Sequence, residues 1–251
     1  MFGQLYKEIL YQPLLNLLVF FYNVIPGHDL GIAIIALTIV IRFVLYPLST
    51  KSIKSQKAMQ NLQPELDKLK KQHKDDREAL SRATMDFYRK NKVNPLSSCL
   101  PLLIQFPILI AIYQVLRDGI NNPQILDLLY PFIHHPGRLD PIFFGFLDLG
   151  KRNVVLAVLA GATQFWQSWM LMKKNKKSPK PQGNDFGAIA ANMSNQMLYI
   201  MPILTVFIAL SFPAGLSLYW VATTMFSIGQ QWLIMRKDKS RDVAMQRLYH
   251  N

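Results

Sequence analysis

The sequence predicts an all-α, polytopic membrane protein with five transmembrane helices, and two observations support this fold class. First, four long windows of the 251-residue chain lack Asp, Glu, Lys and Arg, apart from Arg42 in the first of them: 30–50, 93–116, 153–172 and 186–235. About 20 apolar residues cross the hydrocarbon core as a helix, so the last window can hold two spans. Second, the basic residues cluster between the windows. Helices are expected because a helix satisfies its own backbone hydrogen bonds in lipid.

The placement of the positive charge predicts the topology. Of the 28 Lys and Arg residues, twelve lie in 51–95, five in 173–180 and five in 236–251. The positive-inside rule assigns these segments to the cytoplasm, which places the N-terminus outside and the C-terminus inside. A basic surface can also bind phosphate, so affinity for the ribosome or for lipid is a second explanation of the net charge of +13.

Residues 1–28 predict an amphipathic helix in the outer membrane interface. One face of the helical pattern gathers five apolar or aromatic residues: Phe2, Leu5, Tyr6, Ile9 and Leu10. Because 9–28 also contains no Asp, Glu, Lys or Arg, a sixth span is the alternative, and it would place the N-terminus inside. We expect no cleaved signal peptide and no lipobox cysteine in this sequence.

Residues 51–95, after a first span over 29–50, predict a helical hairpin in the cytoplasm. Pro64 is expected to kink the first arm or to begin a new helical segment. Asp75 and Glu78 form an N-cap and capping-box pattern that predicts the start of the second arm.

The rest of the chain continues this alternation, with a Pro-, Gly- and aromatic-rich outer cap of short helices and turns. The predicted segments are a second span (96–117), the extracytoplasmic cap (118–152), a third span (153–172), a basic cytoplasmic loop (173–194), a fourth span (195–212), a fifth span (216–235) and a cytoplasmic tail (236–251).

Arg42 predicts a hydrated cavity inside the membrane. A charged guanidinium within a span costs at least about 2.5–3.5 kcal/mol, so it needs water or a partner. The window 30–50 and the other three windows contain no Asp or Glu to pair with it. Arg42 precedes Thr50 by eight residues, which is about 12 Å along a helix. Snorkelling of the side chain to the cytoplasmic surface is the alternative.

Polar residues on the other spans can converge on the same cavity. Thr38 lies four residues before Arg42 and so shares its helix face. The alternative interpretation is that each Ser, Thr or Gln only joins neighbouring helices, at about 0.6 kcal/mol per hydrogen bond. The candidate groove residues are Thr38, Arg42, Gln105, Gln164, Gln167, Tyr219, Trp220, Thr223 and Ser227.

The sequence argues against an enzyme and against a cofactor or metal site. All five histidines lie outside the predicted spans, and Ser217 has no neighbouring base that could activate it. The four apolar windows lack the carboxylates that aspartyl proteases and proton-coupled transporters use. No glycine-rich phosphate loop or metal-ligand spacing is present, and the single Cys99 excludes an intrachain disulfide.

The chain resembles the bacterial YidC membrane protein insertases of the YidC/Oxa/Alb family over nearly its whole length. The similar segments are Gln12-Pro-Leu-Leu, Thr38-Ile-Val-Ile-Arg42-Phe-Val-Leu-Tyr-Pro47-Leu, Leu62-Gln-Pro64, Asn94-Pro95-Leu-Ser-Ser-Cys99-Leu-Pro101-Leu-Leu-Ile-Gln105-Phe-Pro107-Ile, Phe212-Pro213-Ala-Gly215-Leu-Ser-Leu-Tyr219-Trp220 and Gln230-Gln231.

This resemblance implies an insertase core in the bacterial cytoplasmic membrane, with a positively charged groove that is closed toward the outside. Arg42 is then the groove arginine, and Thr38, Gln105, Tyr219 and Trp220 are groove or substrate-contact positions. The implied partners are nascent membrane proteins, the ribosome, the Sec translocon, the signal-recognition-particle receptor and membrane lipids, with no specific nucleic acid beyond ribosomal RNA. A small-solute channel or transporter, and an assembly factor that binds helices without moving them, are the alternative functions.

Overall fold

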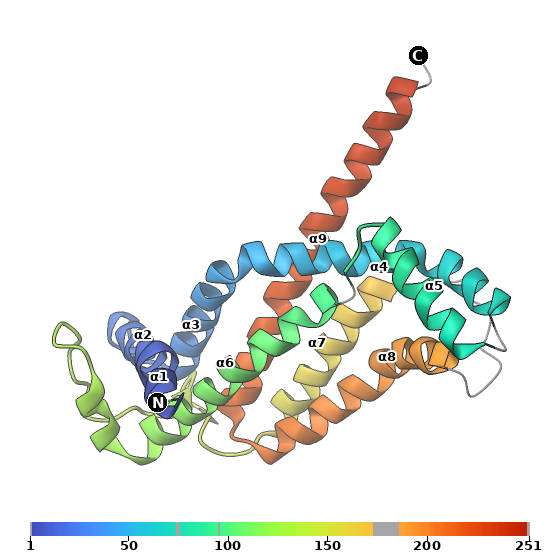
Figure 1. Ribbon diagram of the computed structural model, residues 1–251. Coiled ribbons are helices and arrows are strands. Elements are labelled where there is room, and N and C mark those ends of the chain that lie inside the picture. The colour runs from blue at the N-terminus through green and yellow to red at the C-terminus, as the bar shows by residue number, and fades with distance from the viewer. Residues whose placement is uncertain (1, 74–75, 95, 173–185, 250–251) are drawn as a thin grey trace. The chain divides into compact units, whose positions relative to one another are not determined.

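The computed structural model describes residues 2–73, 76–94, 96–172 and 186–249, and they are mostly helical (Figure 1). The predicted all-α class is confirmed, with the exception of a small β-hairpin in the cap that the sequence did not predict. The elements are α1 (Phe2–Tyr6), the π-helix η1 (Lys7–Tyr11), α2 (Gln12–Val24), α3 (Leu30–Val44), α4 (Tyr46–Gln72), α5 (Arg77–Lys90), α6 (Leu96–Asn121), the 3-10 helix η2 (Pro123–Leu128), β1 (Ile142–Phe143), β2 (Leu147–Asp148), α7 (Val154–Met172), α8 (Phe186–Ser211) and α9 (Ala214–Tyr249).

The chain divides into two compact units, and we describe each of them separately. Unit 1 comprises Met1–Leu45, Leu102–Gln164 and Pro202–Phe226. Unit 2 comprises Tyr46–Pro101, Phe165–Met201 and Ser227–Asn251.

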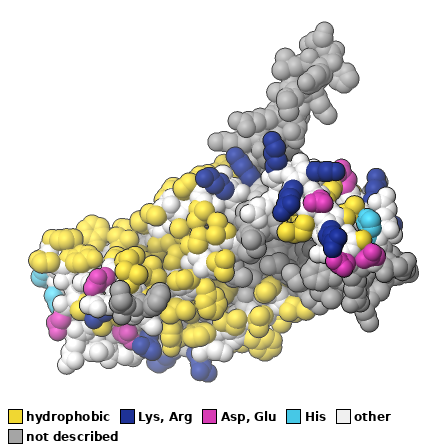
Figure 2. Space-filling model, in the orientation of Figure 1, with side chains coloured by type: hydrophobic (Ala, Val, Ile, Leu, Met, Phe, Trp, Pro, Cys, Tyr) yellow, Lys and Arg dark blue, Asp and Glu magenta, His cyan; other side chains and the backbone are white. Residues whose placement is uncertain are grey.

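Unit 1 is apolar both inside and on its surface. Its core gathers buried side chains from the N-terminal helices, α3, α6 and the cap, including Leu15, Ile34, Ile112 and Leu149. Large apolar side chains also point outward, and Figure 2 shows them over much of the visible face of this unit. A contiguous apolar surface of this kind suits a hydrocarbon surrounding or a binding partner better than water.

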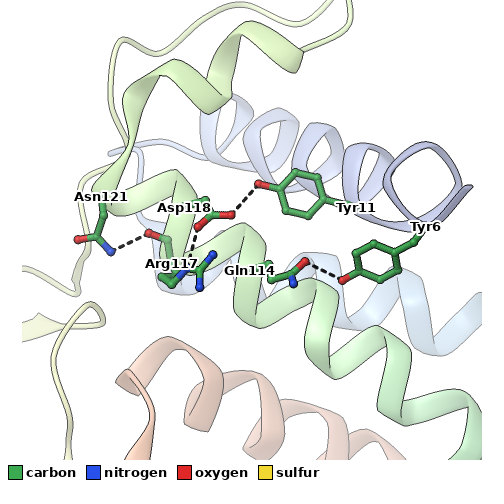
Figure 3. Close-up of polar contacts among 6 residues, drawn as sticks. All are labelled: Tyr6, Tyr11, Gln114, Arg117, Asp118 and Asn121. Atoms are coloured by element: carbon green, nitrogen blue, oxygen red, sulfur yellow. Dashed lines mark hydrogen bonds and ion pairs between the residues drawn. The ribbon is translucent and has the colours of Figure 1, made fainter. Parts of the chain in front are cut away.

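The N-terminal helix, formed by α1, η1 and α2, attaches to α6 by its tyrosines (Figure 3). The hydroxyl of Tyr6 donates to Oε1 of Gln114 at 2.9 Å, and the hydroxyl of Tyr11 donates to Oδ2 of Asp118 at 3.2 Å. Ile9 points away from the protein, with 65% of its surface exposed. The two tyrosines therefore face the protein, whereas Lys7 and Glu8 are exposed together with Ile9.

Asp29 joins the start of α3 to the cap hairpin. Its Oδ1 accepts hydrogen bonds from the backbone N–H groups of Gly31 at 2.8 Å and Ile32 at 3.0 Å, so it caps the helix. Its Oδ2 accepts from the backbone N–H of Phe144 at 2.8 Å. Phe144, which lies between the antiparallel strands β1 and β2, has a positive φ of 50°. One carboxylate thus holds both a helix end and a turn whose backbone conformation is strained.

We expect Asp29→Ala to lower the free energy of unfolding by about 1–3 kcal/mol, because the helix cap and the bond to the cap hairpin are lost together. Asp29→Asn keeps an acceptor for the helix end but loses the charge, so its effect should be smaller. Thermal unfolding in detergent measures both variants. Equal stability of Asp29→Ala and the unmodified protein would contradict this role.

The cap also satisfies the first backbone donors of α9. The N–H of Ala214 donates to the carbonyl of Lys151 at 2.7 Å, and the N–H of Gly215 donates to the carbonyl of Leu149 at 2.9 Å. Nearby, the Lys151 ammonium bonds to Asp148 at 3.0 Å and holds the pKa of that carboxyl below its usual value. These contacts fix the start of the helix that contains Tyr219 and Trp220.

Unit 2 contains the predicted hairpin, with several differences in detail. Helices α4 and α5 lie side by side (Figure 1), and Figure 2 shows both basic and acidic side chains over them. Pro64 lies inside α4, which runs continuously, so it does not begin a new helical segment as one alternative predicted. The residue that caps α5 is Asp76, whose Oδ1 accepts from the N–H groups of Glu78 and Ala79, whereas Asp75 lies outside the described residues.

Helix boundaries also differ from the predicted segments. The first predicted span is interrupted at Leu45, because α3 ends at Val44 and α4 begins at Tyr46. The side-chain amide of Gln230 donates to the backbone carbonyl of Tyr46 at 3.1 Å and to the hydroxyl of Thr50 at 3.0 Å. Helix α8 begins at Phe186, before the predicted residue 195, and α9 continues through the predicted tail to Tyr249.

Among the described residues, one helical segment is by itself long and apolar enough to cross a membrane, and it is Leu103–Asn121. Leu30–Val44 and Tyr46–Leu69 meet the same criterion only as a broken pair, and Tyr199–Ser211 is apolar but shorter. The five-span arrangement therefore stays a prediction.

Candidate functional site

The candidate site begins at Arg42, in the last turn of α3 in unit 1. Its Nη2 donates to Oε1 of Gln105 on α6 at 2.9 Å, and its Nε donates to the hydroxyl of Thr223 on α9 at 3.4 Å, which is a long hydrogen bond. The side chain of Arg42 is half-buried. Three helices that are distant in the sequence thus meet at one guanidinium.

Gln105 continues the network toward the core. Its Nε2 donates to the hydroxyl of Tyr219 at 2.8 Å, while its Oε1 accepts from Arg42. Because each end of the amide has a partner of the matching kind, the orientation of Gln105 is determined. Tyr219 is almost completely buried, with 1% of its surface exposed. The order Tyr219, Gln105, Arg42 therefore runs from the core outward.

The partners of Arg42 are neutral. Ion pairs between side chains are present at other places in the structure, for example between Arg82 and Glu78, Arg117 and Asp118, and Lys151 and Asp148. Within the described part of the chain, no carboxylate lies within ion-pair distance of Arg42. Amide and hydroxyl groups solvate the guanidinium without cancelling its charge, so Arg42 keeps a net positive charge that can attract an anion.

A second polar cluster in unit 1 surrounds Gln164 on α7. Its Oε1 accepts from the hydroxyl of Thr205 on α8 at 2.7 Å and from Nε1 of Trp220 on α9 at 3.1 Å. Thr205 was not predicted from the sequence, although a lone hydroxyl within the apolar segment 200–210 was the available signal. Trp220 follows Tyr219 directly, so α9 contributes adjacent residues to both clusters.

Three candidate residues remain, and Thr38 is the one in unit 1. Thr38 is fully buried and donates to the carbonyl of Ile34 at 2.6 Å, one turn earlier in its own helix. This is the local hydrogen bond that Ser and Thr form within helices, and it directs the hydroxyl away from Arg42. Gln167 and Ser227 belong to unit 2, where Gln167 is half-buried and Ser227 is buried. Of the nine candidates, the structure brings together Arg42, Gln105, Tyr219 and Thr223, and separately Gln164 and Trp220.

The helices expose apolar side chains on their outer surfaces, and in unit 1 they surround an arginine whose hydrogen-bond partners are uncharged. These two features define the class as a helical membrane protein with a polar site among its helices. The chain belongs to the 60Kd inner membrane protein family, whose model matches residues 20–241. This membership makes it an inner membrane protein.

Curated relatives of the chain are named "Membrane protein insertase YidC". The protein from Nitratidesulfovibrio vulgaris strain DP4 is 37% identical over 226 residues, which is 90% of this chain and 38% of the relative. The protein from Ectopseudomonas mendocina is 37% identical over 228 residues, 90% of this chain and 34% of the relative. The protein from Francisella tularensis subsp. novicida is 39% identical over 206 residues, 82% of this chain and 32% of the relative. The chain thus spans about a third of the length of these relatives.

Proposed function

We propose that the chain is a membrane protein insertase, which moves nascent membrane proteins from the cytoplasm into lipid without enzymatic chemistry. The observation that supports this function best is the positive charge of Arg42, whose partners among the described residues are the neutral side chains of Gln105 and Thr223. The names of the relatives support the same function.

In the proposed mechanism, a groove open to the cytoplasm and to lipid shortens the apolar path for a client. A polar backbone or loop group that enters hydrocarbon without a partner costs several kcal/mol. Arg42 attracts an acidic residue of the client, by about 4 kcal/mol at 4 Å and an effective dielectric constant near 20. The apolar segment of the client then leaves sideways into lipid, because burial among acyl chains removes it from water.

The proposed topology has five spans, an N-terminus outside and a C-terminus inside, with the N-terminal helix in the outer interface. The α4–α5 hairpin then lies in the cytoplasm, where it can receive a ribosome, the signal-recognition-particle receptor or the Sec translocon. The abundance of Lys and Arg in residues 51–95 supports this orientation.

Site-specific photocrosslinking to a ribosome-stalled client tests the function. A photoreactive amino acid at Gln105 or Trp220, both partly accessible, should crosslink the client, whereas one at Ile9, exposed on the N-terminal helix, should not. Absence of crosslinks at both site positions would contradict the proposal. Flux of small solutes through proteoliposomes, without insertion of the client, would favour a channel instead.

A further inference from the structure

Gln105 bonds both to Arg42 and to the hydroxyl of Tyr219 in the buried core of the site. We propose that Gln105 is a positioning residue that sets the charge specificity of insertion, because it orients Arg42 without neutralising it. This inference rests on the proposed insertase function and adds a specificity determinant to it.

The anchor of this arrangement is Tyr219, which is too deeply buried to touch a passing client in this structure. Its hydroxyl accepts the amide N–H of Gln105 at 2.8 Å, so the carbonyl oxygen of the same amide points toward Arg42. An amide that reversed its two ends would place an N–H against the N–H of the guanidinium, which is unfavourable. Tyr219 therefore acts on Arg42 through Gln105.

The neutrality of Gln105 matters as much as its geometry. A glutamate has the same shape, and its carboxylate would lie at about the 2.9 Å that now separates the amide oxygen from Nη2. At that distance the two opposite charges would form an ion pair, and a client carboxylate would have to compete with an internal one. Elsewhere in unit 1, Arg117 shows the alternative arrangement, since its Nε bonds to the carboxylate of Asp118 at 2.8 Å.

The experiment compares two clients in proteoliposomes of phosphatidylethanolamine and phosphatidylglycerol. The clients are single-span proteins that differ only in two residues of the translocated tail, Asp in one and Asn in the other, and protease protection of the tail measures insertion. The variants are Gln105→Glu, Arg42→Ala and the double variant. Gln114→Glu is the matched control, because Gln114 lies on the same helix and also bonds to a tyrosine hydroxyl, that of Tyr6.

We expect Gln105→Glu to reduce insertion of the acidic client at least about tenfold and to leave the neutral client within about twofold. Adding Arg42→Ala should not restore insertion of the acidic client and should reduce it further, because the introduced carboxylate then has no partner in the site and repels the client. Gln114→Glu should insert both clients normally. Normal insertion of the acidic client by Gln105→Glu would overturn the inference, and so would an equal loss of both clients, which indicates a purely structural role. If the unmodified protein inserts neither client, the proposed function itself fails.

Discussion

Arg42→Ala is expected to abolish insertion of clients with an acidic translocated tail, whereas Arg42→Lys should largely preserve it. The alanine variant removes the one charge of the site, together with an attraction of about 4 kcal/mol for a carboxylate at 4 Å. That energy corresponds to about a thousandfold in affinity, so a loss of at least tenfold in insertion should be measurable. Lysine keeps the charge but cannot reproduce the two bonds of the guanidinium fork to Gln105 and Thr223, so a modest loss is expected.

Complementation of a depleted strain and protease protection in proteoliposomes both measure this effect. Arg117→Ala is the matched control, because Arg117 is an exposed arginine of the same unit whose charge Asp118 already compensates. Full activity of Arg42→Ala toward acidic clients would remove the charge of the site from the mechanism.

Gly161→Ala is expected to destabilise the protein and to reduce insertion of all clients. A Cβ at Gly161 would lie 2.4 Å from Cγ2 of Val206 and 2.9 Å from the backbone oxygen of Pro202, so α7 and α8 would have to separate. Overpacking of this kind costs about 1–3 kcal/mol. Gln164 lies one turn after Gly161, so the same displacement would weaken its bond to Thr205. Thermal unfolding in detergent should show a lower melting temperature.

Gly229→Ala provides the control for a helical glycine, because a Cβ at Gly229 meets nothing within 4 Å. This variant should be neutral or slightly stabilising, since alanine favours the helix by about 1 kcal/mol over glycine. If Gly161→Ala and Gly229→Ala had the same melting temperature, the close approach of α7 and α8 at Gly161 would not contribute to stability.

The candidate site was partly predictable from the sequence. Arg42 was recognisable because a charge within an apolar window is costly wherever the helix lies. Gln105, Tyr219 and Thr223 were identified only as possible members of a groove, and the structure places them at Arg42. Thr205 was missed, because one hydroxyl in an apolar helix is as compatible with a local bond as with a contact to another helix.

Thr38 and Arg42 show the limit of helix periodicity. Four-residue spacing placed both on one face, but the hydroxyl of Thr38 bonds to its own helix. Spacing determines where a Cβ lies, whereas the rotamer and the available acceptors determine where the polar atom points.

The sequence by itself determined the membrane class, the helical content and the presence of an isolated charge, because these depend on composition and local order along the chain. The tertiary structure decided which polar groups meet. The bonds of Arg42 join residues that are 63 and 181 positions apart, and such pairs form only when the helices adopt one particular packing. That packing depends on the shapes of many side chains at once, such as the contact of Gly161 with α8, and no local pattern of residues specifies it.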